Sequence, residues 1–288
     1  KGCGTAIITP FTEDGVNFEE FRKMIEFQIS EGADSIIVCG TPGESSTMTT
    51  EEKKETIKFA IDVANKRIPI IAGTGGNCTK SAIEMSKYAE SVGADAILVV
   101  TPYYNKTTQE GLIAHYTAIA KSINIPVVLY NVPSRTGLNI TPQTCFELSK
   151  IENIVAIKEA SGNISQVAEI ANLCKDNLYI YSGNDDQILP ILSLGGLGVI
   201  SVLSNIIPKD VHNMVQNFFD GNIKEATNLQ LNTLNLTSAL FCEVNPIPVK
   251  AAVAAMGYCE NFLRLPLTPM EPEHEAKLLA LMKEQNLI

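Results

Sequence analysis

The sequence lacks the features that mark several classes of protein. Its 22 Lys and Arg residues are outnumbered by 32 Asp and Glu residues, so the formal net charge is -10 and a general basic surface for nucleic acid or anionic lipid is absent. The seven cysteines form no CxxC pair, which is typical of reduced thiols in a cytosolic protein. No apolar run approaches the roughly 20 residues of a membrane helix, and the start has no signal-peptide pattern. We expect a soluble, cytoplasmic protein.

Short apolar runs rich in β-branched residues alternate with longer segments of helical spacing. Continuous apolar strands are typical of a parallel sheet that is covered by helices on its faces. The pattern predicts an α/β protein in which residues 1–222 form a (β/α)₈ TIM barrel. The alternative is a doubly wound open sheet, but no GxGxxG follows the first strand. The eight predicted strands are 4–10, 35–40, 69–75, 96–102, 126–133, 154–160, 178–184 and 198–204.

The alternation stops after residue 222. The rest of the chain, 223–288, reads as a C-terminal appendix of three helices over 223–243, 247–258 and 272–286. No low-complexity linker precedes it, so we expect it to pack on the barrel or on a neighbouring subunit.

The stretch "NIVAIKEASGN" (153–163) places Lys158 late in an apolar strand. Burying an ammonium group costs free energy, so its stem either reaches water or the amine is kept neutral. In a barrel, chemistry sits at the carboxyl ends of the strands. A neutral amine there can attack a carbonyl, and a nearby tyrosine can move protons. The same end of the predicted barrel holds Thr41, Tyr103, Tyr104, Tyr130 and Arg135.

Each of these residues has an ordinary structural explanation when taken singly. A lysine in a strand is often a snorkelling edge residue, and strand-end tyrosines commonly cap a core. Arg135 in "PSRTG" could be only a solvated charge in a loop, and "GTPGES" could be only a turn bounded by glycines. Their gathering on one predicted face of the barrel favours a reactive site.

Seven motifs resemble those of the dihydrodipicolinate synthase family, in the pyruvate-dependent class I aldolase group. They keep the family's order and spacing from about Gly4 to Leu267, and "LYNVPSRTG" narrows the likeness within the group. The others are "GTPGES", "TPYYNK", "AIKEASGN", "YSGNDD", "GGLGVISV" and "NPIPVK".

The resemblance implies that pyruvate condenses with L-aspartate-4-semialdehyde through a Schiff base on Lys158, in lysine and diaminopimelate biosynthesis. It implies that Tyr130 transfers protons, with Thr41 and Tyr104 as a hydroxyl relay. In the family the adjacent subunit lends the tyrosine at the Tyr104 position, which implies a dimer at least and usually a dimer of dimers.

The resemblance also implies that Arg135 binds the carboxylate of the semialdehyde, and that Gly183 and Ile200 line the pyruvate pocket. Neither a metal nor an organic cofactor is implied. The three histidines, at 115, 212 and 274, have no metal-ligand spacing.

Position 42 departs from the family, because Pro42 stands where a second threonine is usual. Proline offers the pyruvate carboxylate neither a hydroxyl nor a backbone N–H. Two alternatives therefore stay open beside the synthase. One is another aldolase of the group, acting on sialic acid or a keto-deoxy sugar acid, which the Arg135 loop disfavours. The other is a keto-acid-binding barrel with catalysis weakened by Pro42.

The resemblance also bears on inhibition by lysine. In lysine-inhibited members the amino acid occupies a cleft at the dimer interface, and Ser45, Asn77 and Tyr103 match residues of that cleft. Its two histidine positions hold Thr50 and Lys53, and its glutamate position holds Ser81. A lost carboxylate and an added ammonium both oppose lysine binding, so we expect insensitivity to lysine.

Overall fold

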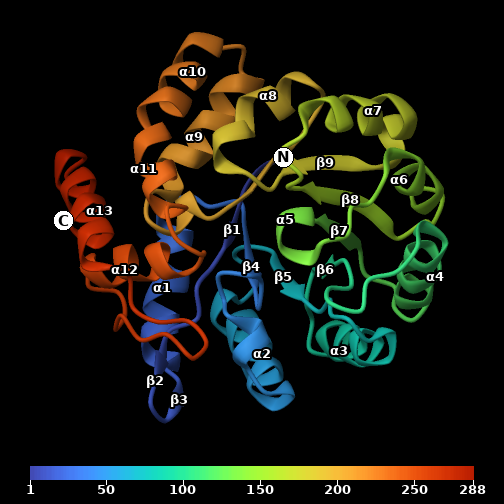
Figure 1. Ribbon diagram of the computed structural model, residues 1–288, viewed down its shortest axis with the longest axis horizontal. Helices are drawn as coiled ribbons and strands as arrows, with labels where there is room; N and C mark the ends of the chain where they lie inside the picture. Colours follow the sequence, from blue (N-terminus) through green and yellow to red (C-terminus); the bar gives the residue numbers. More distant parts are fainter.

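A computed structural model describes all 288 residues. Eight parallel strands close into a barrel in the order β1-β10-β9-β8-β7-β6-β5-β4, with β4 pairing back to β1. The strands lie at the centre of the molecule, inside a ring of helices (Figure 1). They are β1 (Gly2–Ala6), β4 (Ser35–Val38), β5 (Ile70–Gly73), β6 (Ala96–Val100), β7 (Val127–Asn131), β8 (Ile154–Glu159), β9 (Tyr179–Ser182) and β10 (Gly198–Ser201).

The predicted (β/α)₈ barrel and its eight strands are confirmed. Most strands end two or three residues earlier than the apolar runs suggested. In the last unit, for example, β10 ends at Ser201 because Leu203–Asn205 forms a 3-10 turn. The apolar residues that follow a strand therefore belong to the loops that cover the barrel end.

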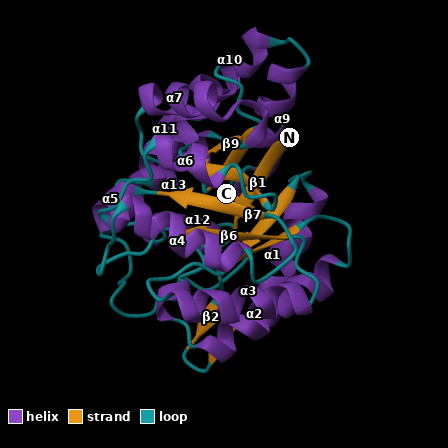
Figure 2. Cartoon of the chain, turned by 90° about the vertical axis from the view of Figure 1, so that its right-hand side faces the viewer, coloured by secondary structure: helices purple, strands orange, loops and turns teal.

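Helices surround the strands, and a small hairpin of β2 (Phe11–Thr12) and β3 (Gly15–Val16) follows β1 (Figure 2). A one-turn helix, α5 (Pro133–Thr136), follows β7 directly. None of the helices combines the length and apolar composition that crossing a bilayer requires. The barrel helices are α1 (Phe18–Ser30), α2 (Thr50–Ala64), α3 (Thr79–Ser91), α4 (Gln109–Ala120), α6 (Pro142–Leu148), α7 (Ile164–Cys174), α8 (Ile188–Ser193) and α9 (Pro208–Phe219).

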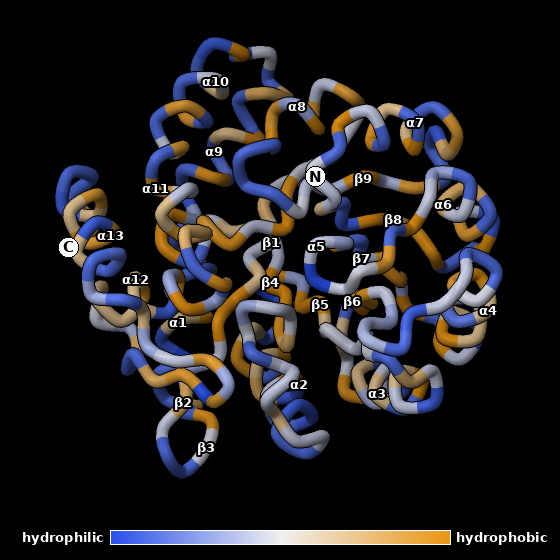
Figure 3. The backbone as a smooth tube through the Cα atoms, viewed as in Figure 1, coloured by the Kyte–Doolittle hydropathy of each residue, from blue (hydrophilic) through white to orange (hydrophobic).

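The core has two parts, because alternate residues of a strand point to opposite faces. Outward-facing residues such as Ile157 join a large cluster between the strands and the helices. Figure 3 shows the hydrophobic strands at the centre and more hydrophilic residues among the outer helices. Inward-facing residues fill the barrel itself, and they are Ala6, Ile37, Leu98, Val128, Tyr130, Val132, Ala156, Ala160 and Ile200.

The C-terminal segment has four helices, so the prediction of three was wrong. The predicted helix 223–243 is divided into α10 (Ile223–Asn232) and α11 (Leu234–Leu240). At the junction, the Thr233 hydroxyl donates hydrogen bonds to the carbonyl oxygens of Leu229 and Gln230. Such bonds to the preceding turn bend helices. α12 (Ile247–Ala255) and α13 (Pro272–Glu284) follow.

The C-terminal segment packs on the barrel, as one of the two expected arrangements. It lies beside α1 and the β2–β3 hairpin (Figure 1). The rings of Tyr258 and Phe27 lie 4.6 Å apart, and the Arg264 guanidinium lies 4.2 Å from the centre of the Phe11 ring. Arg264 also forms a forked ion pair with Glu52, at 2.5 and 3.0 Å.

Glu52 joins this segment to the start of α2. Its carboxylate accepts a hydrogen bond from the Thr49 N–H at 2.8 Å, and the Thr49 hydroxyl accepts one from the Glu52 N–H, which completes a capping box. The hydrogen bond from Arg264 is the largest cause that lowers the pKa of Glu52 to about 2.

We predict that Glu52→Gln lowers the free energy of unfolding at pH 7 by about 1 to 2 kcal/mol, through the loss of a charged cap and ion pair. Because the folded-state pKa of Glu52 is depressed from 4.5 to about 2, its contribution is present above the unfolded pKa and is lost as the pH falls towards the folded one. The difference between wild type and variant should therefore narrow below pH 5.

Urea denaturation at pH 7, 5 and 3 measures this difference. Glu51→Gln is the matched control, because Glu51 lies on the same helical turn in an exposed pair with Lys54. A Glu52→Gln effect that is equal at all three pH values would contradict an electrostatic origin.

Candidate active site

Lys158 lies inside the barrel near its carboxyl end. It shares a face of β8 with Ala156 and Ala160, both in the inner cluster. Its side chain is 3% exposed. Lys158 therefore points into the barrel, as predicted, and it is not a snorkelling residue at the edge of a sheet.

Tyr130 is the partner of Lys158 on the neighbouring strand. The two residues are paired in the register of β7 and β8, and the Lys158 ammonium lies 4.4 Å from the centre of the Tyr130 ring. On the outer face the next pair is Asn131 and Glu159, and the Asn131 amide donates to the Glu159 carboxylate at 2.9 Å. The Ser161 N–H donates to the same carboxylate at 2.7 Å. These outer bonds hold the strand ends that carry the inner pair.

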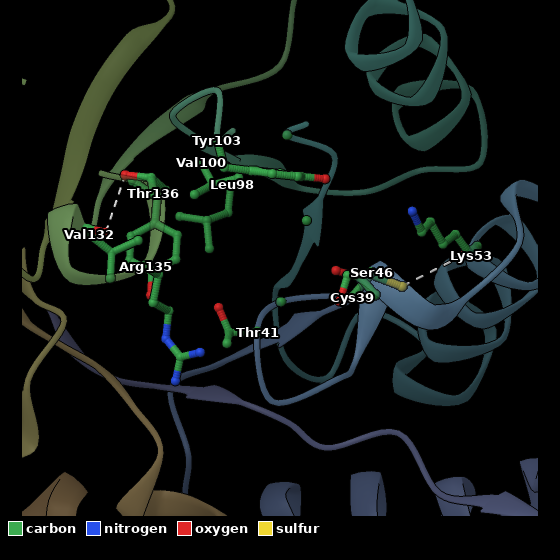
Figure 4. Close-up of a pocket in the computed structure, with 15 residues that line it drawn as sticks. Cys39, Thr41, Ser46, Lys53, Leu98, Val100, Tyr103, Val132, Arg135 and Thr136 are labelled. Carbon is green, nitrogen blue, oxygen red and sulfur yellow. Dashed lines mark hydrogen bonds between the residues drawn. The ribbon is translucent and has the colours of Figure 1, made fainter. Parts of the chain in front are cut away.

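A cavity of about 220 Å³ is lined by Tyr130, although Lys158 itself is not among the residues that line it. Figure 4 shows Thr41 and Arg135 on one side of it, and Ser46 and Lys53 on the other. Its lining residues come from the carboxyl ends of four consecutive strands, β4 to β7, and from the segments that follow them, and they include Thr41, Tyr103, Tyr130, Arg135, Ser45 and Lys53.

Thr41 begins a tight turn after β4. The Glu44 N–H donates to the Thr41 carbonyl at 3.1 Å, which places Pro42 second in the turn. Proline is favoured at that position because its ring presets the backbone angle φ. Pro42 is buried, and Thr41 is half-buried at the cavity. Pro42 therefore supports the turn that presents Thr41, and it supplies no donor of its own.

Arg135 projects from α5, the single helical turn after β7. One of its guanidinium nitrogens donates to the Asn245 carbonyl at 3.1 Å, while the side chain as a whole remains exposed. A guanidinium group has five donors, so four remain for a ligand in the cavity. The geometry suits the forked recognition of a carboxylate.

The other predicted residues divide between the site and its surroundings. Gly183 lies against Lys158, since a β-carbon at position 183 would be 3.1 Å from the lysine Cε. Ile200 is inside the barrel, but it borders a second cavity at the opposite, amino-terminal end of the strands. Tyr104 points away, 91% exposed, on the loop after β6, and its neighbour Tyr103 lines the cavity instead.

Asp185 is a buried acid near the site to which the sequence motifs assigned no role, although "YSGNDD" contains it. One carboxylate oxygen accepts the N–H groups of Val202 and Leu203, both at 3.0 Å, and the other has no hydrogen-bond partner. Burial raises the pKa of Asp185, and the positive charge of Lys158 is among the groups that oppose this shift.

Glu44 and Lys250 form a buried ion pair behind the Thr41 turn, and sequence reasoning missed it as well. The available signal was a lysine inside the apolar helix "IPVKAAVAA", which resembles the signal that singled out Lys158.

Cys39 also borders the cavity, but burial raises the pKa of its thiol to about 12. The reactive thiolate is therefore scarce near neutral pH. Among the nucleophilic side chains at the site, the geometry favours the amine of Lys158.

Comparison with known proteins extends over the whole chain. Residues 1–285 match the model of the dihydrodipicolinate synthetase family. The chain is 59% identical over 288 residues to the 4-hydroxy-tetrahydrodipicolinate synthase of Clostridium perfringens, covering 100% of this chain and 99% of that protein.

Two solved structures share the fold closely. Dihydrodipicolinate synthase from Aquifex aeolicus has a TM-score of 0.98 at 44% identity, covering 100% of this chain and 98% of that one. The enzyme from Cyanidioschyzon merolae, solved with lysine bound, has a TM-score of 0.97 at 40% identity, with the same coverage.

We predict that Gly183→Ala slows borohydride trapping of a keto acid at Lys158 by about tenfold or more. The added methyl group would lie 2.6 Å from the Ala160 Cβ and 3.1 Å from the Lys158 Cε, and relieving such overpacking typically costs about 1 to 3 kcal/mol. Intact mass after timed borohydride quenching measures the rate.

Gly76→Ala is the control, because a β-carbon there meets nothing within 4 Å. Equal trapping rates in wild type and Gly183→Ala would show that Lys158 adjusts freely and that the glycine is not required.

Proposed function

The chain belongs to the dihydrodipicolinate synthetase family, and on that footing we propose that it is a 4-hydroxy-tetrahydrodipicolinate synthase. It is a lyase that condenses pyruvate with L-aspartate-4-semialdehyde, in lysine and diaminopimelate biosynthesis. The observation that carries the proposal is the buried Lys158 amine, 4.4 Å from the centre of the Tyr130 ring at the carboxyl end of the barrel.

The chemistry begins at Lys158. Its neutral amine attacks the keto carbon of pyruvate, a C–N bond forms, and the keto oxygen leaves as water. The resulting imine withdraws electrons, so a methyl proton departs and an enamine remains. The enamine carbon then bonds to the aldehyde carbon of the second substrate, whose oxygen takes up a proton. Displacement of Lys158 by the amino group of that substrate closes the ring and frees the enzyme.

Proton transfers in this sequence need a hydroxyl group beside the imine. Tyr130 fills that role by its position against Lys158, and Thr41 lines the same cavity as the next hydroxyl of a relay. A group that transfers protons is most effective when its pKa suits the transfer. A chain of hydroxyl groups moves protons without separating charges in the apolar barrel.

Tyr104 completes the relay in a neighbouring copy of the chain. In a single copy it is 91% exposed and has a positive φ of 67°. A bulky residue held in that region is strained, which supports a loop shaped to reach another subunit. The working unit is therefore a homodimer at least, and a dimer of dimers gives the homotetramer.

Arg135 receives the carboxylate of the semialdehyde through its free donors. Gly183 leaves room for pyruvate beside Lys158, and Ile200 forms part of the apolar wall of the barrel. Pro42 stands beside the pyruvate carboxylate without offering a hydrogen bond, so Thr41 and its turn take a larger share of pyruvate binding. Since Lys158 itself provides the electron sink, the reaction needs no metal or organic cofactor. The seven free cysteines support a cytoplasmic location.

We predict that borohydride in the presence of pyruvate modifies Lys158, and that Lys158→Met abolishes the mass increase. Peptide mapping by mass spectrometry identifies the labelled lysine. Lys250 is an internal comparator, because it is also a fully buried lysine. Modification of Lys250, or of no lysine at saturating pyruvate, would rule out Lys158 as the Schiff-base residue.

The cavity also bears on regulation by lysine. Ser45, Lys53 and Tyr103 line the same space as Arg135, so an amino acid with two ammonium groups would meet the ammonium of Lys53. Repulsion between two such charges a few ångströms apart is about 1 to 4 kcal/mol near a protein surface, and each 1.4 kcal/mol weakens binding about tenfold.

We predict that L-lysine at about 1 mM leaves the rate of the coupled synthase assay unchanged. Lys53→Gln removes the like charge and should tighten lysine binding by about fivefold to several hundredfold. Titration calorimetry on both proteins provides a readout independent of activity. Clear inhibition of the wild type by millimolar lysine would show that the cleft still accepts an ammonium group.

A further inference from the structure

The ion pair between Glu44 and Lys250 joins two distant parts of the chain beneath the active site. Both side chains are fully buried. The ammonium of Lys250 also donates to the carbonyl oxygens of Thr9, at 2.9 Å, and Phe262, at 3.0 Å. The second carboxylate oxygen of Glu44 accepts the N–H of Arg264 at 3.1 Å. All three donors of the lysine and both oxygens of the glutamate are thereby engaged.

Such a pair is weak evidence for stability, because desolvation of two charges offsets most of their attraction. The ion pair instead fixes the position of the Glu44 carboxylate. Lys250 lies on α12 and Thr9 follows β1, so the carboxylate of Glu44 is held between the barrel and the C-terminal segment.

The backbone of Glu44 connects the ion pair to the turn of Thr41. Glu44 has a left-handed φ of 50°, which is uncommon for a residue with a side chain. Its N–H closes the turn onto the Thr41 carbonyl at 3.1 Å. Its carbonyl accepts the N–H and the hydroxyl of Thr47, both at 3.0 Å. Glu44 therefore lies between the ion pair on one side and the turn of Thr41 on the other.

The intervening residue, Gly43, tightens the same arrangement. A β-carbon there would lie 3.1 Å from the Thr9 hydroxyl and 3.4 Å from the backbone of Cys39. The turn thus packs directly on Thr9, in the segment after β1, whose carbonyl accepts a hydrogen bond from Lys250. The space behind Thr41 leaves little room for the turn to move.

We propose that Glu44 and Lys250 are positioning residues that hold the Thr41 hydroxyl in the proton relay, so that the C-terminal segment is part of the catalytic apparatus. The proposal rests on the role of Thr41 proposed above. The alternative is that the pair only stabilises the fold, and the two are separable by whether its effect passes through Thr41.

The test uses the double variant Glu44→Gln/Lys250→Met, which removes both charges together at similar volume and leaves no buried charge unpaired. It is compared with wild type in two backgrounds, native and Thr41→Val. Circular dichroism and thermal unfolding establish that each protein is folded. The matched control is Glu26→Gln/Arg67→Met, which removes an exposed ion pair between α1 and the end of α2.

We expect the double variant to lower kcat about tenfold in the native background and less than twofold in Thr41→Val, while borohydride still labels Lys158. The control should leave kcat unchanged in both. Equal losses in both backgrounds, or no loss in the native one, would overturn the proposal. If the double variant does not fold, Glu44→Asp replaces it, since this change keeps the charge but shortens the reach by one C–C bond, about 1.5 Å; the same two outcomes apply.

The same measurements distinguish a failure of this positioning proposal from a failure of the proposed synthase function. If the wild-type protein does not trap pyruvate at Lys158, the proposed function itself is overturned. If the folded Glu44→Gln/Lys250→Met variant traps pyruvate normally and has an unaltered kcat, only the positioning role of the ion pair is overturned. A Thr41→Val variant with wild-type kcat would remove the relay role of Thr41, and the positioning role with it.

Discussion

The closure of eight parallel strands into a barrel is the constraint on which the site depends. In a closed barrel, alternate residues of every strand must point inward, so a lysine two residues from Ala156 and two from Ala160 has no route to the outer face. The ammonium of Lys158 is thereby held among apolar side chains and against the Tyr130 ring. The side chain therefore points to the carboxyl end of the barrel, where chemistry is placed in this fold.

The chain holds two buried lysines, one in the barrel and one on α12, and they have different partners. Lys158 has an aromatic ring beside its ammonium, whereas Lys250 has the carboxylate of Glu44. Burial lowers the pKa of Lys250, the carboxylate of Glu44 opposes that shift, and three hydrogen bonds fix the amine, so Lys250 is suited to holding structure. Lys158 is held in no such ion pair, which suits the nucleophilic role proposed for it. Residue type alone does not distinguish these outcomes.

The C-terminal segment contributes to the site from outside the barrel. The carbonyl of Asn245 accepts a hydrogen bond from Arg135, and Lys250, five residues on, binds Glu44 behind the Thr41 turn. Residues at the two ends of this short stretch therefore contact Arg135 and the turn that carries Thr41. These contacts are the basis for the proposal that the C-terminal segment supports the active site.

The sequence by itself determined the barrel, because short continuous apolar runs and the helical spacing between them are local properties of each segment. It also determined that Lys158, Tyr130, Thr41 and Arg135 would meet, since strand ends of a parallel barrel converge on one face. The break at Thr233 was not predictable in the same way, because threonine is common inside helices and its hydroxyl bends one only in some contexts.

Only the tertiary structure decided which buried lysine has a carboxylate partner and which does not. "IVAIKEA" and "IPVKAAVAA" carry the same local signal, a lysine among apolar residues. The partner of Lys250 is 206 residues away in the sequence, and nothing in either segment states that they meet. The charge state of a buried amine depends on the groups that folding places around it, and those groups come from distant parts of the chain.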